Sequence, residues 1–383
     1  MIFLPKRFIF NETSYHGEGA INEIPAEIRH RNYKKAFIIT DADLLKAGVV
    51  SKITDILEKF SIPYDIFSDI KPNPTTKNVK DGVDAFSASD SDMIIAVGGG
   101  SVIDAAKAIG IILTNPDYSN VTRLEGLNNV KNRPVPMFAI PTTAGTAAEV
   151  TIYFVITDEE SKKKMVCISP YSVPEIAFVD PVMMMSMPKN LLAATGMDAL
   201  THAIEGYTTK DATTFSDLFC LRAIKEISSS LKKAAEGENE AFSSLALGQY
   251  FAGMGFSNSG LGLVHSMAHP LGALYDMPHG MANAIILPVV MEFNFDSRKD
   301  KFKDIVKAFG LAPLTDDESL KSALIEYIKK LSESLGIPKN LRDYISEDDL
   351  DFLAESAYND PCRPGNPKDV TKDDIKKLYL RLI

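Results

Sequence analysis

The 383-residue sequence contains no run of 18 consecutive apolar residues, so it predicts no membrane-spanning helix. Residues 5–7 (Pro-Lys-Arg) interrupt the apolar N-terminus, and no apolar stretch of useful length follows them, so no signal peptide is predicted. There are only three cysteines, Cys167, Cys220 and Cys362, and they lie far apart in the sequence. This scarcity argues against a disulfide framework or a cysteine-based zinc site, and it favours the cytoplasm.

Positive charge is also in short supply, because 41 lysines and arginines face 51 acidic residues and give a net charge of -10. An acidic surface argues against nucleic acid or an anionic membrane as the main partner. Internal repeats and low-complexity tracts are missing as well. The length is sufficient for two domains, and the 45% hydrophobic content is ordinary for a globular enzyme.

The first half of the chain alternates short apolar runs with helical patterns. Continuous apolar runs of four to six residues suit strands that are buried on both faces, as in a parallel α/β sheet. The expected strands are residues 36–40, 93–97, 135–140 and 176–179, the expected helices include 49–60 and 102–113, and residues 152–169 are expected to add a hairpin. From about Pro188 onward the periodicity is helical. We therefore expect an α/β domain over residues 1–185 and an all-helical domain over residues 186–383, with 359–369 as its least regular segment.

A glycine-rich turn follows one of these strands directly. Gly98, Gly99, Gly100 and Ser101 lie between the apolar run and a helix that starts near Val102. Exposed backbone N–H groups and the positive end of the helix dipole would suit a pyrophosphate. The alternative is a tight turn that binds nothing, and the GxGxxG dinucleotide fingerprint is missing from the first strand.

Two further polar loops follow apolar strands. Asp41 ends an earlier strand, where its carboxylate would bind ribose hydroxyls and repel a 2′-phosphate, which favours NAD over NADP. It would serve equally well as a helix N-cap. Residues 141–146 (PTTAGT) would either line a ligand or form an ordinary turn.

Histidine is used sparingly, yet four of the six histidines fall between positions 202 and 279. Asp198 and His202 are four residues apart on an expected helix, as are His265 and His269, so each pair shares a helix face. The spacing of an Asp–His pair by itself favours a structural role. Together with His279, however, the pattern favours a shared N/O metal site for Fe(II) or Zn(II), while the spacing leaves open which three histidines bind the ion.

Five long motifs give the chain a resemblance to the iron-containing (group III) alcohol dehydrogenases. The motifs are GGGSVIDAAK, PTTAGTAAEVT, ATGMDALTHAIEGY, GLGLVHSMAHPLG and MPHGMANAIILP. The resemblance implies a Rossmann-like N-terminal domain with an all-helical C-terminal domain, the dehydroquinate synthase-like fold, in a homodimer. It also implies NAD(H)-dependent interconversion of a small aldehyde and a primary alcohol. Shorter stretches such as RLEGL, ALGQY and AGMGFSN narrow the likeness to the subgroup that acts on lactaldehyde and 1,2-propanediol.

The same resemblance assigns roles to individual residues. The metal ligands would be Asp198, His202, His265 and His279, and His269, close by but not a ligand, would move a proton. The NAD contacts would be Asp41, Asn73, Gly99, Gly100, Ser101, Thr142, Thr143 and Lys164. Tyr153, Phe256 and Cys362 would line the substrate pocket.

One departure from the family pattern concerns the substrate. Tyr153 stands where the family pattern has asparagine, and an aromatic ring facing the substrate would change the volume and polarity of the pocket. Other small alcohols, a glycerol dehydrogenase activity, and a cyclising synthase of the dehydroquinate type remain alternatives. The synthase would need several basic residues around the histidines, and few are present. A non-enzymatic NAD- or metal-sensing protein is a further alternative, but it would not explain a spare His269.

Overall fold

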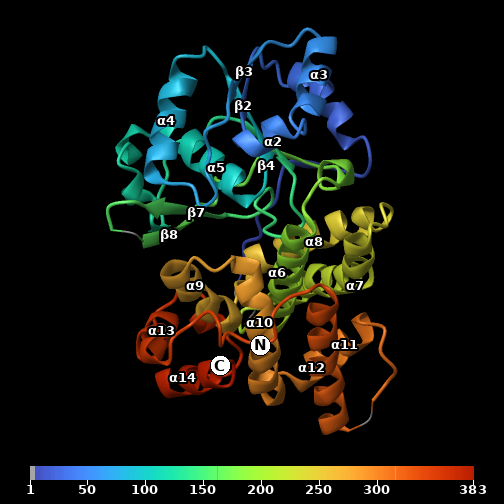
Figure 1. Ribbon diagram of the computed structural model, residues 1–383. Helices are drawn as coiled ribbons and strands as arrows, with labels where there is room; N and C mark the ends of the chain where they lie inside the picture. The colour runs from blue at the N-terminus through green and yellow to red at the C-terminus, as the bar shows by residue number, and fades with distance from the viewer. Residues whose placement is uncertain (1–4, 162, 315) are drawn as a thin grey trace. The chain divides into compact units, whose positions relative to one another are not determined.

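The computed structural model describes residues 5–161, 163–314 and 316–383 (Figure 1). The start of the apolar N-terminal segment (residues 1–4) and Lys162 in the turn of the expected hairpin lie outside the described residues. The chain divides into two compact units, Met1–Thr143 with Ala147–Ser186, and Ala144–Thr146 with Met187–Ile383. Within the described part, no helix is long and apolar enough to cross a membrane.

The first unit is built on a six-stranded, all-parallel sheet with the strand order β1-β9-β6-β4-β2-β3. The strands span Thr13–His16 (β1), Ala36–Ile39 (β2), Tyr64–Phe67 (β3), Met93–Gly98 (β4), Met137–Pro141 (β6) and Ile176–Val179 (β9). The four central strands are fully buried, as their apolar runs predicted. The edge strands β1 and β3 were not predicted, because each is largely half-exposed or exposed and carries polar residues.

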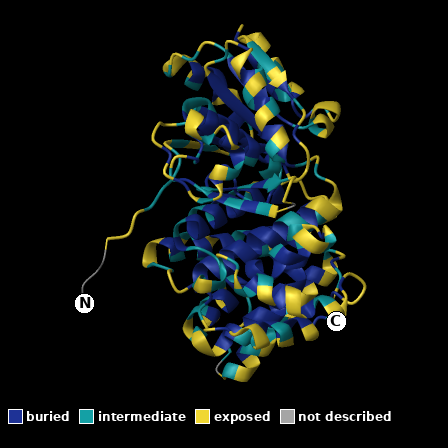
Figure 2. Ribbon diagram, turned by 90° about the vertical axis from the view of Figure 1, so that its left-hand side faces the viewer, coloured by how far each residue is buried: buried dark blue, intermediate teal, exposed yellow. Residues whose placement is uncertain are grey.

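Alternate residues of the central strands enter two separate hydrophobic cores. Phe37 and Ile39 of β2 face the core that contains α4 (Thr76–Ser87) and α5 (Gly100–Thr114). Ala36 and Ile38 face the opposite core, which contains α1 (Ile24–His30) and α3 (Ser51–Lys59). Helices therefore cover both faces of the sheet, and Figure 2 shows the sheet strands as dark, buried ribbon. This is the expected doubly wound α/β architecture.

This layering creates a topological switch point between β2 and β4. The chain leaves β2 through the short α2 (Ala42–Lys46) toward α3 on one face, whereas it leaves β4 directly into α5 on the other face. In open α/β sheets, ligands bind at the carboxyl ends of two strands whose following helices lie on opposite faces. The candidate cofactor residues Asp41 and Gly99 to Ser101 lie at these two strand ends.

A small second sheet contacts α5 through a buried lysine. It has the order β5-β8-β7, with β5 over Gly126–Leu127, and the antiparallel pair β7 (Tyr153–Asp158) and β8 (Lys163–Ile168) is the expected hairpin. Lys107 of α5 is 1% exposed, and its Nζ donates to the carbonyl oxygens of Thr151 (2.7 Å) and Tyr153 (2.8 Å). Burial lowers the pKa of Lys107, while the charges of Asp104 and Glu149 oppose that shift. Helix α5 is thus fastened to the start of the hairpin.

The second unit contains helices and, among its described residues, no β-strand. Its helices span Lys189–Thr208 (α6), Thr214–Glu236 (α7), Ala241–Ser259 (α8), Leu263–Tyr275 (α9), His279–Asn294 (α10), Lys299–Ala308 (α11), Asp317–Ser334 (α12), Leu350–Tyr358 (α13) and Lys372–Leu380 (α14). The long helix α6 packs against α7, α8 and α10, and α10 also packs against α9. Three helices that will carry the candidate site are therefore neighbours.

Gly280 lets α10 begin in contact with α6. A Cβ atom at this position would lie 2.1 Å from the carbonyl oxygen of Ala194 and 3.2 Å from the Cβ of Asp198. Because the closest atom belongs to the backbone of α6, no side-chain rotation would relieve the clash. The absence of a side chain at Gly280 thus fixes the distance between the first turn of α10 and the middle of α6.

Gly280→Ala should therefore destabilise the helical unit by about 1–3 kcal/mol, because one of the two helices must move. The matched control is Gly110→Ala in α5, where a Cβ would meet its nearest atom at an ordinary 3.6 Å. That change should be neutral or stabilise by up to about 1 kcal/mol, since alanine is the better helix former. Denaturant unfolding of both variants is the measurement. Equal stability of Gly280→Ala and the parent would show that the contact between the helices is not close.

Candidate functional site

Four side chains from three helices meet inside the helical unit. Asp198 and His202 come from α6, His265 comes from α9, and His279 is the first residue of α10. Each offers one ligand atom, and these atoms all lie within 4.8 Å of one another. Asp198, His202 and His265 are buried, while the side chain of His279 is 38% exposed. His279 is thus the most exposed member of the cluster.

The distances within this cluster fit a shared cation better than direct hydrogen bonds. Asp198 Oδ1 lies 3.7 Å from the Nε2 atoms of His265 and His279 and 3.9 Å from Nε2 of His202. These separations exceed hydrogen-bond length. They are close to the ligand–ligand spacing of a tetrahedral ion whose ligands lie at about 2.1 Å. One carboxylate and three imidazoles suit Fe(II) or Zn(II), so the donor set fits a metal of this kind.

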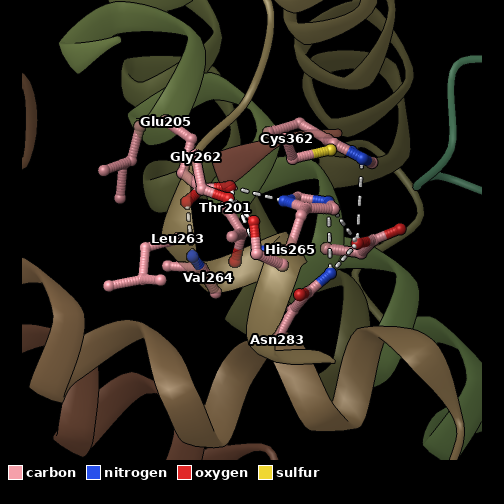
Figure 3. A network of polar contacts seen from close by, with 12 residues as sticks. Thr201, Glu205, Gly262, Leu263, Val264, His265, Asn283 and Cys362 are labelled. Carbon is pink, nitrogen blue, oxygen red and sulfur yellow. Dashed lines mark hydrogen bonds and ion pairs between the residues drawn. The ribbon is translucent and has the colours of Figure 1, made fainter. Parts of the chain in front are cut away.

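Glu205 fixes the orientation of the His265 ring. It lies on α6, is 5% exposed, and its Oε2 lies 2.6 Å from Nδ1 of His265. The same carboxylate accepts the backbone N–H of Val264 (2.6 Å) and of His265 (3.4 Å) at the start of α9 (Figure 3). When the ring is neutral and donates Nδ1–H to Glu205, the lone pair of His265 is on Nε2, which faces Asp198. A carboxylate behind a histidine in this way also raises the basicity of a metal ligand.

Asn283 closes the cluster from α10, one turn after His279. Its Nδ2 donates to Asp198 Oδ1 at 2.7 Å and lies 3.2 Å from Nε2 of His265 and 3.1 Å from Nε2 of His279. Figure 3 shows Glu205 and Asn283 approaching His265 from different sides. The fully buried amide therefore holds the carboxylate of Asp198 in place.

The electrostatics favour a cation at this position. Burial alone would raise the pKa of Asp198, but the three imidazoles outweigh it and hold that pKa far below its usual range. Burial lowers the pKa of His202 to about 4 and that of His279 to about 3, so both rings are neutral at neutral pH. Asp198 and Glu205 raise the pKa of His265 to about 9 against the effect of burial. A metal ion would therefore replace the proton of His265 as the positive charge beside Asp198.

The other candidates of the helical unit lie around this cluster. The ring of Phe256 is buried and stacks on His202, with a centroid separation of 4.2 Å. His269 stacks on His279 at 5.3 Å, and its Nδ1 lies 2.7 Å from Asp360 Oδ2. The half-buried Cys362 donates its backbone N–H to the other oxygen of Asp360 at 2.8 Å. The role of Phe256 and Cys362 in a substrate pocket stays a prediction, and so does that of Tyr153, the first residue of β7 in the other unit.

Asp41 takes one of the two roles that its position suggested and leaves room for the other. It is the N-cap of α2, where its Oδ1 accepts the N–H groups of Asp43 (3.0 Å) and Leu44 (2.8 Å). Both bonds use the same oxygen, so Oδ2 is not occupied by the cap. A structural cap and a ribose contact are therefore compatible in one carboxylate.

The remaining cofactor candidates form two groups beside the glycine loop. Asn73 accepts from the Nζ of Lys164 (2.9 Å), and its backbone N–H donates to Ser101 Oγ (3.3 Å). Thr142 donates its N–H to the carbonyl of Gly98 at 3.1 Å. A Cβ on Gly99 would lie 2.9 Å from Thr143, so the two loops touch. No acidic residue lies in the first turn of α5, which leaves its positive end available to a phosphate.

Three residues of the helical site were not predicted from the sequence, namely Glu205, Asn283 and Asp360. Glu205 follows Asp198 by seven residues, or two helical turns, so the helix-face argument that paired Asp198 with His202 extends to it. Asn283 follows His279 by four residues and would be found in the same way. Asp360 lies 91 residues from its partner His269, and no local pattern connects them.

Comparison with known proteins agrees with this architecture. The model of the iron-containing alcohol dehydrogenases matches residues 11–181, and that of the C-terminal part of the same family matches residues 192–383. The lactaldehyde reductase of Escherichia coli (strain K12) is 47% identical over 98% of this chain and 99% of its own length. The 1,3-propanediol dehydrogenase of Klebsiella pneumoniae is 38% identical and covers 97% of each chain. The solved alcohol dehydrogenase from Oenococcus oeni superposes with a TM-score of 0.95 at 36% identity, over 99% of this chain and 100% of that one.

The parallel sheet with its glycine loop and the helical unit with its Asp–His cluster are thus those of a dehydrogenase. The chain belongs to the iron-containing alcohol dehydrogenase family, and it is an alcohol dehydrogenase.

The anchoring of α9 by Glu205 leads to a prediction for protein treated with a chelator. Glu205→Gln should lower the free energy of unfolding by about 1–3 kcal/mol, because at least one buried donor at the start of α9 loses its acceptor. The control is Glu236→Gln in the last turn of α7, where the side chain is 57% exposed and the change should stay within about 0.5 kcal/mol. If both variants unfold at the same denaturant concentration, Glu205 does not hold α9.

Proposed function

We propose that this alcohol dehydrogenase interconverts lactaldehyde and 1,2-propanediol with NAD(H), using one divalent cation, Fe(II) or Zn(II), bound by Asp198, His202, His265 and His279. The observation that carries the proposal is the geometry of the cluster. Three Nε2 atoms surround one buried carboxylate oxygen at 3.7–3.9 Å, and Glu205 holds His265 with its lone pair toward that oxygen. The 47% identity to a lactaldehyde reductase supports the substrate.

A divalent cation at this position supplies a Lewis acid that polarises an aldehyde oxygen or lowers the pKa of an alcohol. The residues of the chain position the ligands of this cation and the substrate. Asn283 keeps Asp198 turned toward the three imidazoles, and the buried ring of Phe256 supports one face of His202. His279 is the most exposed member, so substrate approaches on its side. His269, stacked on His279 and 31% exposed, passes a proton between the substrate oxygen and solvent.

For the cofactor we propose NAD(H) at the switch point between β2 and β4. NAD(H) carries the hydride when bound. The N-terminal turn of α5, with Gly99, Gly100 and Ser101, would hold the pyrophosphate, and Asp41 Oδ2 would accept from the ribose hydroxyls. The remaining contacts would come from Asn73, Lys164, Thr142 and Thr143. The homodimer stays a prediction.

The proposal is tested with protein that has been stripped by a chelator and reloaded with Fe(II) or Zn(II). The reloaded protein should oxidise NADH with lactaldehyde, and it should do so more efficiently than with 3-hydroxypropanal, butanal, acetaldehyde, formaldehyde or the ketone dihydroxyacetone. His265→Ala and His279→Ala should each lose the bound metal and all turnover, because each removes a ligand that no neighbour replaces. His30→Ala in α1, outside this cluster, is the control and should keep both.

The measurement pairs elemental analysis with the kcat/KM for each aldehyde. A variant with full metal content and normal turnover would remove that histidine from the ligand set. Higher kcat/KM with another aldehyde would reject lactaldehyde as the substrate while leaving the metal site in place.

A second prediction concerns cofactor choice. Asp41→Gly should admit NADPH, because the change removes both the ribose acceptor and the repulsion of a 2′-phosphate. Asp41→Asn is the matched variant, since an asparagine keeps the N-cap of α2 but loses the charge. Both variants should lower the ratio of kcat/KM for NADH to that for NADPH, and only Asp41→Gly should lose the cap. An unchanged ratio in both variants would mean that Asp41 only caps the helix.

A further inference from the structure

Residues 359–369, the least regular segment of the sequence, are tightly fastened in the structure. They connect α13 to α14. Asn366 is 1% exposed and exchanges hydrogen bonds with the side chain of Asn294 at the end of α10 (2.8 and 2.9 Å). Its Oδ1 also accepts the N–H of Leu263 at the start of α9 (3.4 Å). The segment is therefore tied to two of the three helices that carry the metal cluster.

Gly365 ties the same segment to the third helix. Its carbonyl oxygen accepts from Thr209 Oγ1 and from the N–H of Lys210, both at 2.8 Å, just after α6 ends. A Cβ on Gly365 would lie 2.2 Å from the carbonyl oxygen of Leu261. No larger residue fits there without moving the backbone. The segment of residues 359–369 is therefore held by contacts at the ends of all three helices.

The side chain that this segment places is Asp360. It is 10% exposed, and both of its oxygens accept hydrogen bonds, Oδ2 from Nδ1 of His269 (2.7 Å) and Oδ1 from the N–H of Cys362 (2.8 Å). Burial would raise the pKa of Asp360, but His269 and the N–H of Cys362 outweigh it and lower that pKa. Asp360 is therefore an ionised acceptor behind the His269 ring.

Helix α9 thus carries two histidines on successive turns, and each is paired with a carboxylate from another segment. In the first, Glu205 Oε2 holds Nδ1 of His265 at 2.6 Å, and Nε2 of His265 faces Asp198. In the second, Asp360 holds Nδ1 of His269, and the ring lies 6.1 Å from that of His265, outside the group of four ligands. In both pairs Nδ1 is hydrogen-bonded to a carboxylate. Nε2 of His265 faces the metal cluster, whereas His269 does not belong to that cluster.

We propose that Asp360 is a positioning residue for proton transfer. By accepting Nδ1–H it holds His269 in the tautomer whose Nε2 carries the lone pair and can take the proton of the alcohol oxygen. The imidazolium formed in this way gives that proton back in the direction of aldehyde reduction. This rests on the function proposed above for His269. His269, Asp360 and Cys362 are close enough to hold a cation themselves. A cation bound at Nδ1 of His269 would displace the hydrogen bond between His269 and Asp360, whereas the positioning role keeps that bond.

The kinetic test is a double-mutant cycle on the metal-loaded protein. His269→Ala should lower kcat by about 10²–10⁴-fold, as loss of a general acid–base does. Asp360→Asn should lower kcat by about 10–100-fold, as loss of a carboxylate behind a functional histidine does, with metal content and the KM for NADH unchanged. In the His269→Ala background, Asp360→Asn should cost less than about twofold more. Asp369→Asn, in the same segment with a 97% exposed side chain, is the control and should match the parent.

Three results would overturn the proposal. These are full kcat in Asp360→Asn, additive losses in the double variant, and a fall in metal content, which would assign Asp360 to an ion. The spectroscopic arm does not depend on activity. In ¹⁵N-histidine-labelled, Zn(II)-loaded protein, the resonances lost in His269→Ala should report Nδ1–H in the parent and shift toward Nε2–H in Asp360→Asn. An Nε2–H tautomer in the parent would reject the role of Asp360 even if no aldehyde of the panel were reduced.

Discussion

The helical unit is organised around one buried carboxylate. Asp198 sits 3% exposed among three imidazoles, and an ionised carboxylate in such a place is costly unless a positive charge accompanies it. The residues around Asp198 hold the three imidazoles at distances that allow a single cation to supply this positive charge. Gly280 brings α10 against α6, Glu205 turns His265, and Asn283 fixes the carboxylate.

The NAD(H) site that we propose in the sheet unit would have to bind a dianionic pyrophosphate and a ribose. Strands β2 and β4 lie side by side, and the helices that follow them, α3 and α5, cover opposite faces of the sheet. Backbone N–H groups at the start of α5 and the carboxylate of Asp41 then face the same switch point. The buried Lys107 adds rigidity, because it joins α5 to the hairpin that carries Tyr153 and Lys164.

The sequence was most informative where a local pattern suffices. The buried central strands are recognisable as continuous apolar runs. Strands β1 and β3 have the mixed polar and apolar pattern of sheet edges, and they were not predicted. Helical spacing placed Asp198 beside His202, and His265 on one face with His269. It could not tell which of the latter two joins the cluster, because the choice depends on Glu205 and Asp360, which come from other segments. Asp360 has no local signal, since its position depends on contacts of Gly365 and Asn366 made far along the chain.

The central claim, that Asp198 and three histidines share one cation, is tested most directly by anomalous diffraction at the iron edge from crystals of the Fe(II)-loaded protein. The account predicts a single peak within about 2.1 Å of Asp198 and of Nε2 of His202, His265 and His279. His269 and Asp360 should remain hydrogen-bonded to each other beside it. A peak bound by His269, Asp360 and Cys362 instead, or no peak at all in catalytically active crystals, would contradict the account.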